Sequence, residues 1–476
     1  MPSVAIVGGG FGGVGAAALL RRAGHTDVTL FERGEQLGGV WHHNTYPGAA
    51  CDIPSHLYEY SFAPNPNWSR RYAPQAEIQA YVEDVARRSG VDAHTSTEVR
   101  SASWDGARWV LETSAGTHVA DVLITACGQL SQPSVPPLPG LESFAGHAFH
   151  TAQWRHDVPL AGRRVAVIGT GCSAVQVVPA IADEVESLTV YQRSPAWTIP
   201  KLDFAYPPRA QALFKRFPAL QRLDRASVFY FHEFFTHGMT RHHRLLKLLE
   251  AAGRFNIRRG IKDPALRWHV TPTDVVGCKR VMLTDDWYPA LARPNVELVT
   301  EGIEAITPDG VRTRDGRERP ADAIVLATGF KSHEFVAPME IAGAGGRTLA
   351  QEWAEVARAY LGVTVPGFPN LFLLYGPNTN GGTGSVVSTI ESSIAHVLAA
   401  LRELDRRGAS TIEVRREAAD AFNADLRQAL AGTVWHSGCT NWYVDEHGND
   451  PSQWPWTWLE YRRRTATLDP DAYALS

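Results

Sequence analysis

Two short apolar runs in the chain each end in a glycine turn, and each turn is followed by a segment with helical spacing. The first run, Val4 to Val7, ends in the sequence GGGFGG, and the second, Arg163 to Ile168, has a charged start and ends in GTGCSA. A strand, a glycine turn and a helix start form the pattern that binds a dinucleotide. Two such units predict two dinucleotides held face to face, and so electron transfer between them.

In the first unit, Gly8, Gly10 and Gly13 fit the spacing GxGxxG. The first glycine allows the tight turn, the second lets the backbone meet a pyrophosphate, and the third lets the helix pack on the strand. We expect the helix to span residues 14 to 23 and the next strand residues 28 to 31. Glu32 ends that strand, where an acid binds ribose hydroxyls. The alternative is a surface glutamate at a strand end.

In the second unit, Gly169, Gly171 and Ala174 take the three small positions. Its second strand ends in Gln192, Arg193 and Ser194 rather than in an acid. An acid would repel a 2′-phosphate, whereas an arginine can bind one with two hydrogen bonds. The second dinucleotide is therefore expected to be NADPH rather than NADH, with Arg193 as the phosphate ligand. The alternative is an ordinary exposed arginine.

The loop 38–52, GGVWHHNTYPGAACD, follows the ribose site and includes Gly39 and Trp41. Its position suits contact with the flavin end of a bound FAD, although it could also be an ordinary buried loop. Further along, residues 75–89 have the spacing of an amphipathic helix, and a proline-rich stretch at 133–139 indicates a domain boundary. A helix with a long apolar face, at 386–406, is assigned to the first domain, which makes that domain discontinuous. Further strands are expected at 107–113, 119–125, 296–300 and 323–326, with a strand and turn at 371–378.

The resulting prediction is an α/β fold with two dinucleotide-binding, Rossmann-like domains and a helical insertion. The FAD-binding domain would comprise residues 1–140 and 327–476. The NADP-binding domain would comprise residues 141–326, with the insertion at 204–270.

Composition narrows the possible partners. The chain has 476 residues and a net charge of −4, which argues against a nucleic-acid-binding protein. Its five cysteines are scattered and contain no CxxC pair, so we expect a reducing compartment, no disulfide framework and no metal site. A first strand that begins at Val4 leaves no room for a signal peptide, and no apolar window is long enough to span a membrane. These features predict a cytoplasmic protein.

Residues 207–262 differ from the rest of the chain. They contain twelve Lys or Arg against three Asp or Glu, a net of +9, with eight aromatic residues interleaved. One interpretation is a helical cap with an aromatic core and a solvated basic face. The other is a face that meets an anionic membrane surface or an acyl substrate.

The segment between the two turns carries a family resemblance. The pattern Phe144-x-Gly146-xxx-His150-xxx-Trp154 resembles the fingerprint of type I Baeyer–Villiger monooxygenases. The resemblance covers nearly the whole chain and extends to Gly38-Gly39-Val40-Trp41, Cys51-Asp52, Lys279-Arg280, Ala327-Thr328-Gly329 and Gly376-Pro377-Asn378. One departure is Arg155, because the family has Pro or Asp there. Related N- and S-oxygenating flavin monooxygenases have a looser version of the motif.

The resemblance implies that NADPH reduces FAD, that reduced flavin binds O2 as a C4a-peroxide, and that this peroxide converts a ketone into an ester or lactone. Arg280 would stabilise the peroxide because arginine stays charged, and Asp52 would orient Arg280. Lys279 would be a second phosphate ligand and Asn378 a cofactor contact. His150 and Trp154 would couple domain motion to nicotinamide position, or simply pack at a hinge.

Two alternatives to this activity stay open at this point. The same oxygenated flavin could oxidise nitrogen or sulfur. In the other alternative, the protein would be a membrane- or protein-binding flavoprotein with weak oxidase activity.

Overall fold

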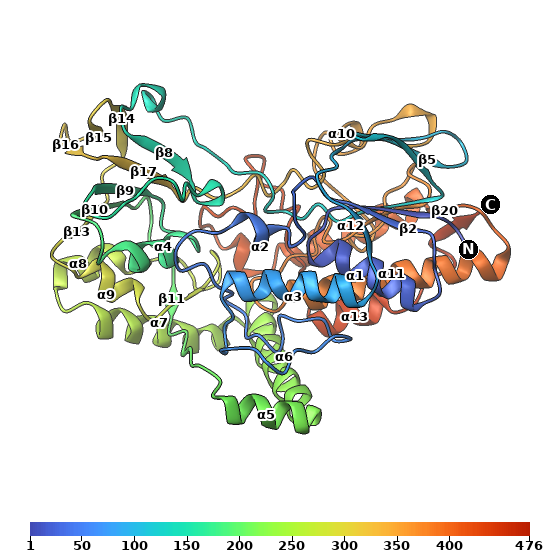
Figure 1. The fold of residues 1–476 in the computed structure, drawn as a ribbon, viewed down its shortest axis with the longest axis horizontal. Coiled ribbons are helices and arrows are strands. Elements are labelled where there is room, and N and C mark those ends of the chain that lie inside the picture. The colour runs from blue at the N-terminus through green and yellow to red at the C-terminus, as the bar shows by residue number, and fades with distance from the viewer.

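Two five-stranded parallel sheets form the two halves of the molecule, and each contains the strand that precedes one of the glycine turns (Figure 1). The structure is a computed structural model that describes all residues, 1–476. The first sheet has the order β19 (Leu371–Leu373), β7 (Val122–Thr125), β1 (Val4–Val7), β2 (Val28–Phe31) and β3 (Asp92–His94). The second has the order β13 (Val296–Val299), β10 (Ser187–Tyr191), β9 (Arg164–Ile168), β17 (Ala323–Leu326) and β8 (His147–His150). The α/β prediction is confirmed.

The first half is built from two distant parts of the chain. Helix α1 (Phe11–Arg22) packs against α11 (Val386–Arg407), and β19 extends the first sheet beside β7. Helix α3 (Gln75–Arg88) lies where the sequence predicts it. Helix α1 begins three residues earlier than expected, because Gly12 and Gly13 are already helical. The domain limits stay a prediction, which this arrangement of sheets supports.

One predicted strand, residues 119–125, is wrong. The chain turns at Asp121 and divides the apolar run between β6 (Gly116–Ala120) and β7. Strand β6 belongs to a separate sheet with the order β18 (Glu340–Ala342), β4 (Val99–Trp104), β5 (Trp109–Thr113) and β6. The carboxylate of Asp121 accepts hydrogen bonds from the amide and the hydroxyl of Ser3, which fixes the turn beside the start of β1. One apolar run can therefore contribute strands to two sheets when a polar residue inside it, here Asp121, forms hydrogen bonds with a distant part of the chain.

Each glycine turn packs closely against the residue that follows the neighbouring strand, Ala126 after β7 and Ala327 after β17. A Cβ at Gly8 would lie 2.4 Å from the carbonyl oxygen of Ala126, and one at Gly169 would lie 2.4 Å from that of Ala327. Both glycines also have positive φ angles, +113° and +112°. Only glycine fits this close approach, so the two halves use one turn geometry twice.

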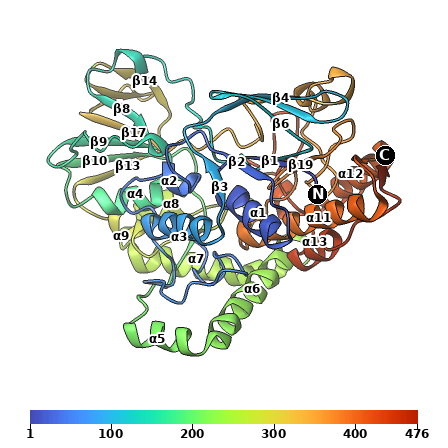
Figure 2. The same ribbon diagram turned by 45° about the vertical axis from the view of Figure 1, so that its right-hand side comes forward.

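The helical insertion links the two halves from below in Figures 1 and 2. It comprises α5 (Pro208–Arg216), α6 (Pro218–Thr240), α7 (Lys247–Gly260) and α8 (Pro264–Val270). Helix α7 packs on β11 (Thr198–Ile199) and α9 (Trp287–Leu291) of the second half. Helix α6 binds the first half, because Arg225 pairs with Glu391 and donates to the carbonyl of Glu59. The insertion is helical as predicted, but its aromatic residues do not form a core, since five of the eight are exposed.

The remaining elements are short or terminal. They are α2 (Val40–His43), β12 (Met282–Leu283), β14 (Ile303–Thr307), β15 (Gly310–Thr313), β16 (Glu318–Pro320), α10 (Leu349–Glu352), β20 (Ile412–Val414), α12 (Arg416–Leu430), α13 (Trp458–Thr465) and β21 (Tyr473–Leu475). Trp435, Trp454 and Trp458 of the C-terminal region are buried, whereas Trp442 is 39% exposed. No helix in the chain combines the length and the apolar composition that crossing a membrane requires.

Candidate active site

A cleft of about 1090 Å³ runs between the two halves. It is lined by the loop 44–53, the second glycine turn, the segment 191–194, the pair Lys279 and Arg280, and the C-terminal segment 440–442. Ligand pockets usually measure about 300–1,000 Å³, so this cleft has room for an extended ligand. Predicted residues of both halves, among them Asp52, Arg193 and Arg280, therefore meet at one cleft.

Arg280 and Asp52 form an ion pair across this cleft. Arg280 donates to Oδ2 of Asp52 from Nη2 at 2.6 Å and from Nε at 3.2 Å. The side chains are 29% and 24% exposed, so both face the cleft from otherwise buried positions. Asp52 belongs to the loop after β2, whereas Arg280 precedes β12. The fold thus brings together two residues that the sequence separates by 228 positions.

The pair stays charged because each partner favours the charged form of the other. Burial opposes ionisation of Asp52, but the guanidinium of Arg280 outweighs it and holds the pKa of Asp52 below its usual value. The carboxylate likewise holds the pKa of Arg280 well above its usual value. Burial raises the pKa of Tyr375, which lines the same cleft, so its phenol stays protonated. Arg280 therefore presents a fixed positive charge that does not titrate in the neutral range.

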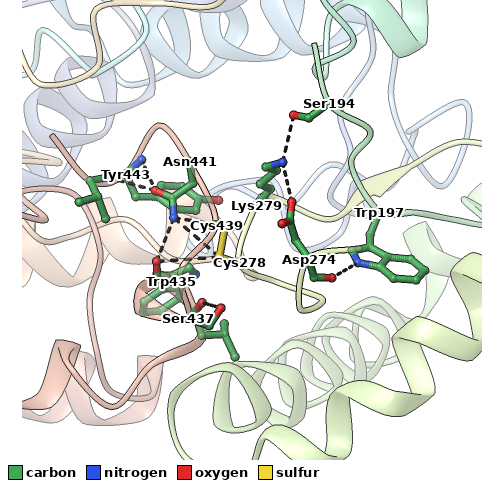
Figure 3. The surroundings of a disulfide bond; sticks show 12 residues. Ser194, Trp197, Asp274, Cys278, Lys279, Trp435, Ser437, Cys439, Asn441 and Tyr443 are labelled. Atoms are coloured by element: carbon green, nitrogen blue, oxygen red, sulfur yellow. Dashed lines mark hydrogen bonds and ion pairs between the residues drawn. A yellow bond between two sulfur atoms is a disulfide. The ribbon is translucent and has the colours of Figure 1, made fainter. Parts of the chain in front are cut away.

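A second cationic cluster lines the cleft where the second dinucleotide strand ends. Arg193 is exposed there and forms no ion pair. The Lys279 ammonium lies 2.6 Å from a carboxylate oxygen of Asp274 and donates to the hydroxyl of Ser194 at 3.0 Å (Figure 3). A Cβ at Gly171 would meet nothing within 4 Å, so the backbone there is open to an approaching group. Two cations, a hydroxyl and an open glycine turn fit the phosphates of NADPH.

The first glycine turn is held by Glu32. Its carboxylate accepts hydrogen bonds from the amides of Gly9 and Gly34, both at 2.6 Å. A Cβ at Gly13 would lie 1.8 Å from the carbonyl oxygen of Gly8, so helix and strand approach as the motif requires. Gly39 packs on Gly10, where an added Cβ would come within 2.9 Å of the Gly10 Cα. Glu32 is buried beside the turn rather than free on the surface.

The other predicted residues lie around the cleft rather than in it, except Trp41. The Trp41 indole lines the cleft and donates to the hydroxyl of Tyr58 at 3.1 Å. His150 ends β8, packs edge-on against Phe330, and has its pKa lowered by burial. Trp154 packs on Phe149 at 5.1 Å between ring centroids.

The Asn378 amide donates to the carbonyls of Asp450 and Gln453. It therefore holds the C-terminal segment, and nothing in these contacts places it against a cofactor.

The prediction of no disulfide is wrong. Cys278 and Cys439 form a disulfide bond across 161 positions of sequence (Figure 3). The bond joins the segment that carries Lys279 and Arg280 to the C-terminal segment. Asn441 of that segment donates to the carbonyl of Trp435 and accepts from the amide of Tyr443. Spacing gave no signal for this pair because neither cysteine has a partner nearby in sequence.

Two further residues, which no sequence motif marks, join the two halves at the cleft. Gln176 on α4 (Ala174–Ile181) accepts from the hydroxyl of Tyr46 at 3.0 Å and donates to the carbonyl of Ala50 at 2.9 Å. His232 of α6 accepts a hydrogen bond at Nδ1 from the amide of Gly384 at 3.3 Å. Burial lowers the pKa of His232 to about 4, so this imidazole is neutral. A glutamine or histidine on a helix carries no motif, so only the fold identifies these contacts.

Fold and site together define an oxidoreductase that binds a flavin and a nicotinamide dinucleotide. A family model described as pyridine nucleotide-disulphide oxidoreductase matches residues 5–223. Over 476 residues the chain is 43% identical to a Baeyer–Villiger monooxygenase of Streptomyces coelicolor, covering 99% of this chain and 92% of that one. It is 42% identical to a Baeyer–Villiger monooxygenase of Pseudomonas aeruginosa, covering 99% of this chain and 91% of that one. The chain belongs to the Baeyer–Villiger monooxygenase family.

Solved structures agree with this assignment. A steroid monooxygenase bound to NADP matches with a TM-score of 0.89 and 33% identity, covering 100% of this chain and 99% of the other. A structure described as OTEMO in complex with FAD and NADP matches with a TM-score of 0.88 and 26% identity, with the same coverage. The protein is therefore an FAD-dependent NADPH monooxygenase, and both cofactors predicted from the sequence are confirmed.

Proposed function

We propose that Arg280 and Asp52 form the oxygenating centre of an enzyme that inserts one oxygen atom next to the carbonyl of a small ketone or aldehyde. The single observation that carries this proposal is the ion pair of Arg280 with Asp52 at the cleft between the two halves. FAD, once reduced by NADPH, supplies the activated oxygen. The residues of this chain then have to bind both cofactors, keep water out and hold positive charge at one place.

Arg280 suits that task because its charge is fixed and its direction is constrained. Both hydrogen bonds to Asp52 end on one carboxylate oxygen, and Nη1 takes no part in them. Preorganised charge lowers the barrier to a step in which negative charge develops, because no group has to reorient during the reaction. A guanidinium also does not donate its proton, so an anionic oxygen nucleophile beside it keeps its reactivity.

The residues for the two cofactors would belong to separate halves of the molecule. Gly8, Gly10, Gly13 and Glu32 would hold the FAD nucleotide, with Gly39 and Trp41 toward its flavin. Gly169, Gly171 and Ala174 would hold the NADPH pyrophosphate, with Arg193 and Lys279 at the 2′-phosphate. His150 and Trp154, at the end of β8, would couple movement of the second half to the nicotinamide.

Product analysis tests this proposal. The FAD-loaded enzyme is incubated with NADPH, O2 and either a cyclic ketone or a methyl aryl thioether. We expect a lactone from the ketone, in an amount that matches NADPH consumption. Sulfoxide from the thioether without any lactone would assign the enzyme to heteroatom oxygenation instead. Hydrogen peroxide as the sole product from both would indicate an oxidase.

A further inference from the structure

A stripe of large apolar side chains runs along the outer side of α6. Its members are Leu220, Leu223, Tyr230, Phe231 and Phe234, with exposed fractions of 40%, 67%, 59%, 59% and 44%. At 3.6 residues per turn these positions fall within about a third of the helix circumference. The rest of the helix circumference carries the buried residues Gln221, Val228, Phe235 and Thr236. Helix α6 therefore has two apolar faces: one packs inside the protein and the other faces solvent.

The insertion that carries the stripe is rich in exposed cations. Eleven of the twelve cations in residues 207–262 are exposed: Arg209, Lys215, Arg216, Arg222, Arg241, Arg244, Lys247, Arg254, Arg258, Arg259 and Lys262. Only Arg254 and Arg259 have an acidic partner, in Glu250 and Asp285. The other nine are unpaired.

The two remaining acidic residues of the segment do not neutralise the positive charge of this surface. Asp224 binds His56 at 2.8 Å, and Glu233 accepts from the amide of Trp458 at 2.6 Å. Both carboxylates are thus turned toward the protein. The outer surface of the insertion combines unpaired cations with exposed aromatic and aliphatic side chains, which we call the basic helical surface. Helices α5 and α6 lie at the lower edge of the molecule in both views (Figures 1 and 2).

We propose that the basic helical surface docks onto an anionic lipid bilayer. The cations would contact lipid phosphates, and the stripe on α6 would enter the boundary between headgroups and acyl chains. Interfacial helices bind membranes through this combination of cationic and aromatic residues. A partner has to bind both the cations and the apolar stripe, since exposed apolar patches of this kind usually mark an interaction site.

Charge complementarity decides between lipid and the other possible occupants. A second copy of the chain would bring its own unpaired cations against these, which is repulsive. An acidic soluble macromolecule would neutralise the cations but leave Leu223 and Phe231 in water. Only an anionic bilayer offers negative charge and an apolar layer side by side. This docking is independent of the proposed reaction, because none of the residues of the basic helical surface lies in the Arg280–Asp52 centre.

Vesicle sedimentation of the FAD-loaded enzyme tests the proposal. Vesicles of phosphatidylglycerol and phosphatidylcholine at equal parts should retain the enzyme at low salt, whereas pure phosphatidylcholine vesicles should not. High salt should reduce the binding at least tenfold, because it screens exposed charges. Absence of binding to the anionic vesicles at low salt would overturn the proposal, whatever the variants do.

Two sets of variants separate the two contributions. Lys215→Glu, Arg216→Glu and Arg222→Glu together should weaken vesicle binding at least tenfold. The matched control, Arg100→Glu, Arg108→Glu and Arg427→Glu, changes the net charge equally at exposed unpaired sites elsewhere and should bind within twofold of wild type. Leu223→Ser with Phe231→Ser should also weaken binding about tenfold. Val119→Ser with Leu459→Ser, at sites 37% and 43% exposed, is its control.

Two results would assign the surface to another occupant and overturn the proposal. The first is binding of heparin or polyglutamate as tight as that of anionic vesicles, with no effect of Leu223→Ser and Phe231→Ser. The second is a concentration-dependent dimer, seen by analytical ultracentrifugation, that these two substitutions abolish. Both variants alter exposed side chains, and retention of bound FAD checks that they fold.

Discussion

Arg280 donates two hydrogen bonds to one and the same oxygen of Asp52, Oδ2, so a single carboxylate atom fixes the direction of the guanidinium. Arg280→Ala should therefore remove the positive charge at the oxygenating centre but leave cofactor binding in place. Flavin reduction by NADPH should persist, because hydride transfer needs no such charge. Ester formation should fall about a hundredfold or more, the usual loss on removing a preorganised charge partner. The remaining NADPH oxidation should yield hydrogen peroxide.

Asp52→Ala and Arg280→Lys refine this test. Asp52→Ala should give a milder form of the same defect, because the charge remains but its direction is lost. Arg280→Lys should not restore activity, because an ammonium lacks the planar fork of the guanidinium. Ester formation by Arg280→Ala at the wild-type rate would show that Arg280 is only a neighbour of the cofactor.

Arg193→Ala should raise the Michaelis constant for NADPH far more than that for NADH. The lost charge-assisted hydrogen bond is worth about 1.5–3 kcal/mol, or roughly a 10- to 100-fold change. Lys279→Ala should have a smaller effect, because Lys279 is already held by Asp274 and gains less from the phosphate. Steady-state kinetics with both nucleotides measures this, and an equal change for NADPH and NADH would disprove the assignment.

His232 should make the protein sensitive to acid. Its pKa is about 4 in the folded protein, against an ordinary value of 6.5, and its Nδ1 must stay unprotonated to accept from Gly384. The folded state therefore binds fewer protons than the unfolded state between these values. The stabilisation is complete above pH 6.5 and is lost as the pH falls toward 4.

Urea unfolding at pH 7.5 and pH 5 measures this loss. At about 1.4 kcal/mol per pH unit, His232 alone should lower the free energy of unfolding by at most about 2 kcal/mol between pH 6.5 and 5. His232→Asn keeps an acceptor for the Gly384 amide and has no proton to gain, so its stability should fall less. Equal acid sensitivity of the two proteins would exclude His232 as the cause.

The disulfide should matter for coupling as well as for stability. Denatured, unreduced protein should contain three free thiols, those of Cys51, Cys127 and Cys172. Cys439→Ser should release the C-terminal segment from the segment that carries Arg280, and so raise the ratio of hydrogen peroxide to ester severalfold. Loop closure over 161 residues also predicts a loss of about 5 kcal/mol in the free energy of unfolding.

Chemical reduction provides the matched comparison. Wild type treated with dithiothreitol should behave like untreated Cys439→Ser, whereas dithiothreitol should leave that variant unchanged. Five free thiols in wild type purified without reductant would show that the bond does not form.

The sheets and glycine turns could be predicted from the sequence because each is specified by residues close together in the chain. The helices that follow Gly8 and Gly169, for example, begin only three and five residues further along the chain. The turn at Asp121 could not be predicted, because the residue that binds it, Ser3, lies 118 positions away.

In the site, too, contacts between residues far apart in the sequence could not be predicted from local patterns. The pairing of Arg280 with Asp52 followed from a family resemblance, since no spacing rule joins residues so far apart. Exposure in the insertion was misjudged for a different reason. The sequence shows how many aromatic residues the insertion has. Whether Tyr230 and Phe231 are exposed depends on which side of α6 packs against the rest of the protein. The disulfide was missed because five scattered cysteines offer no preferred pair.

The discontinuous first half has a consequence for synthesis on the ribosome. The second sheet is complete once residue 326 has been made, whereas the first must wait for β19 at residues 371–373 and for α11. The inserted half can thus fold while one edge of β7 and the outer face of α1 are still uncovered. A nascent chain that stops before residue 371 would carry a finished second half and an unfinished first half. Such a chain is a target for chaperones and proteases, although it already contains both glycine turns.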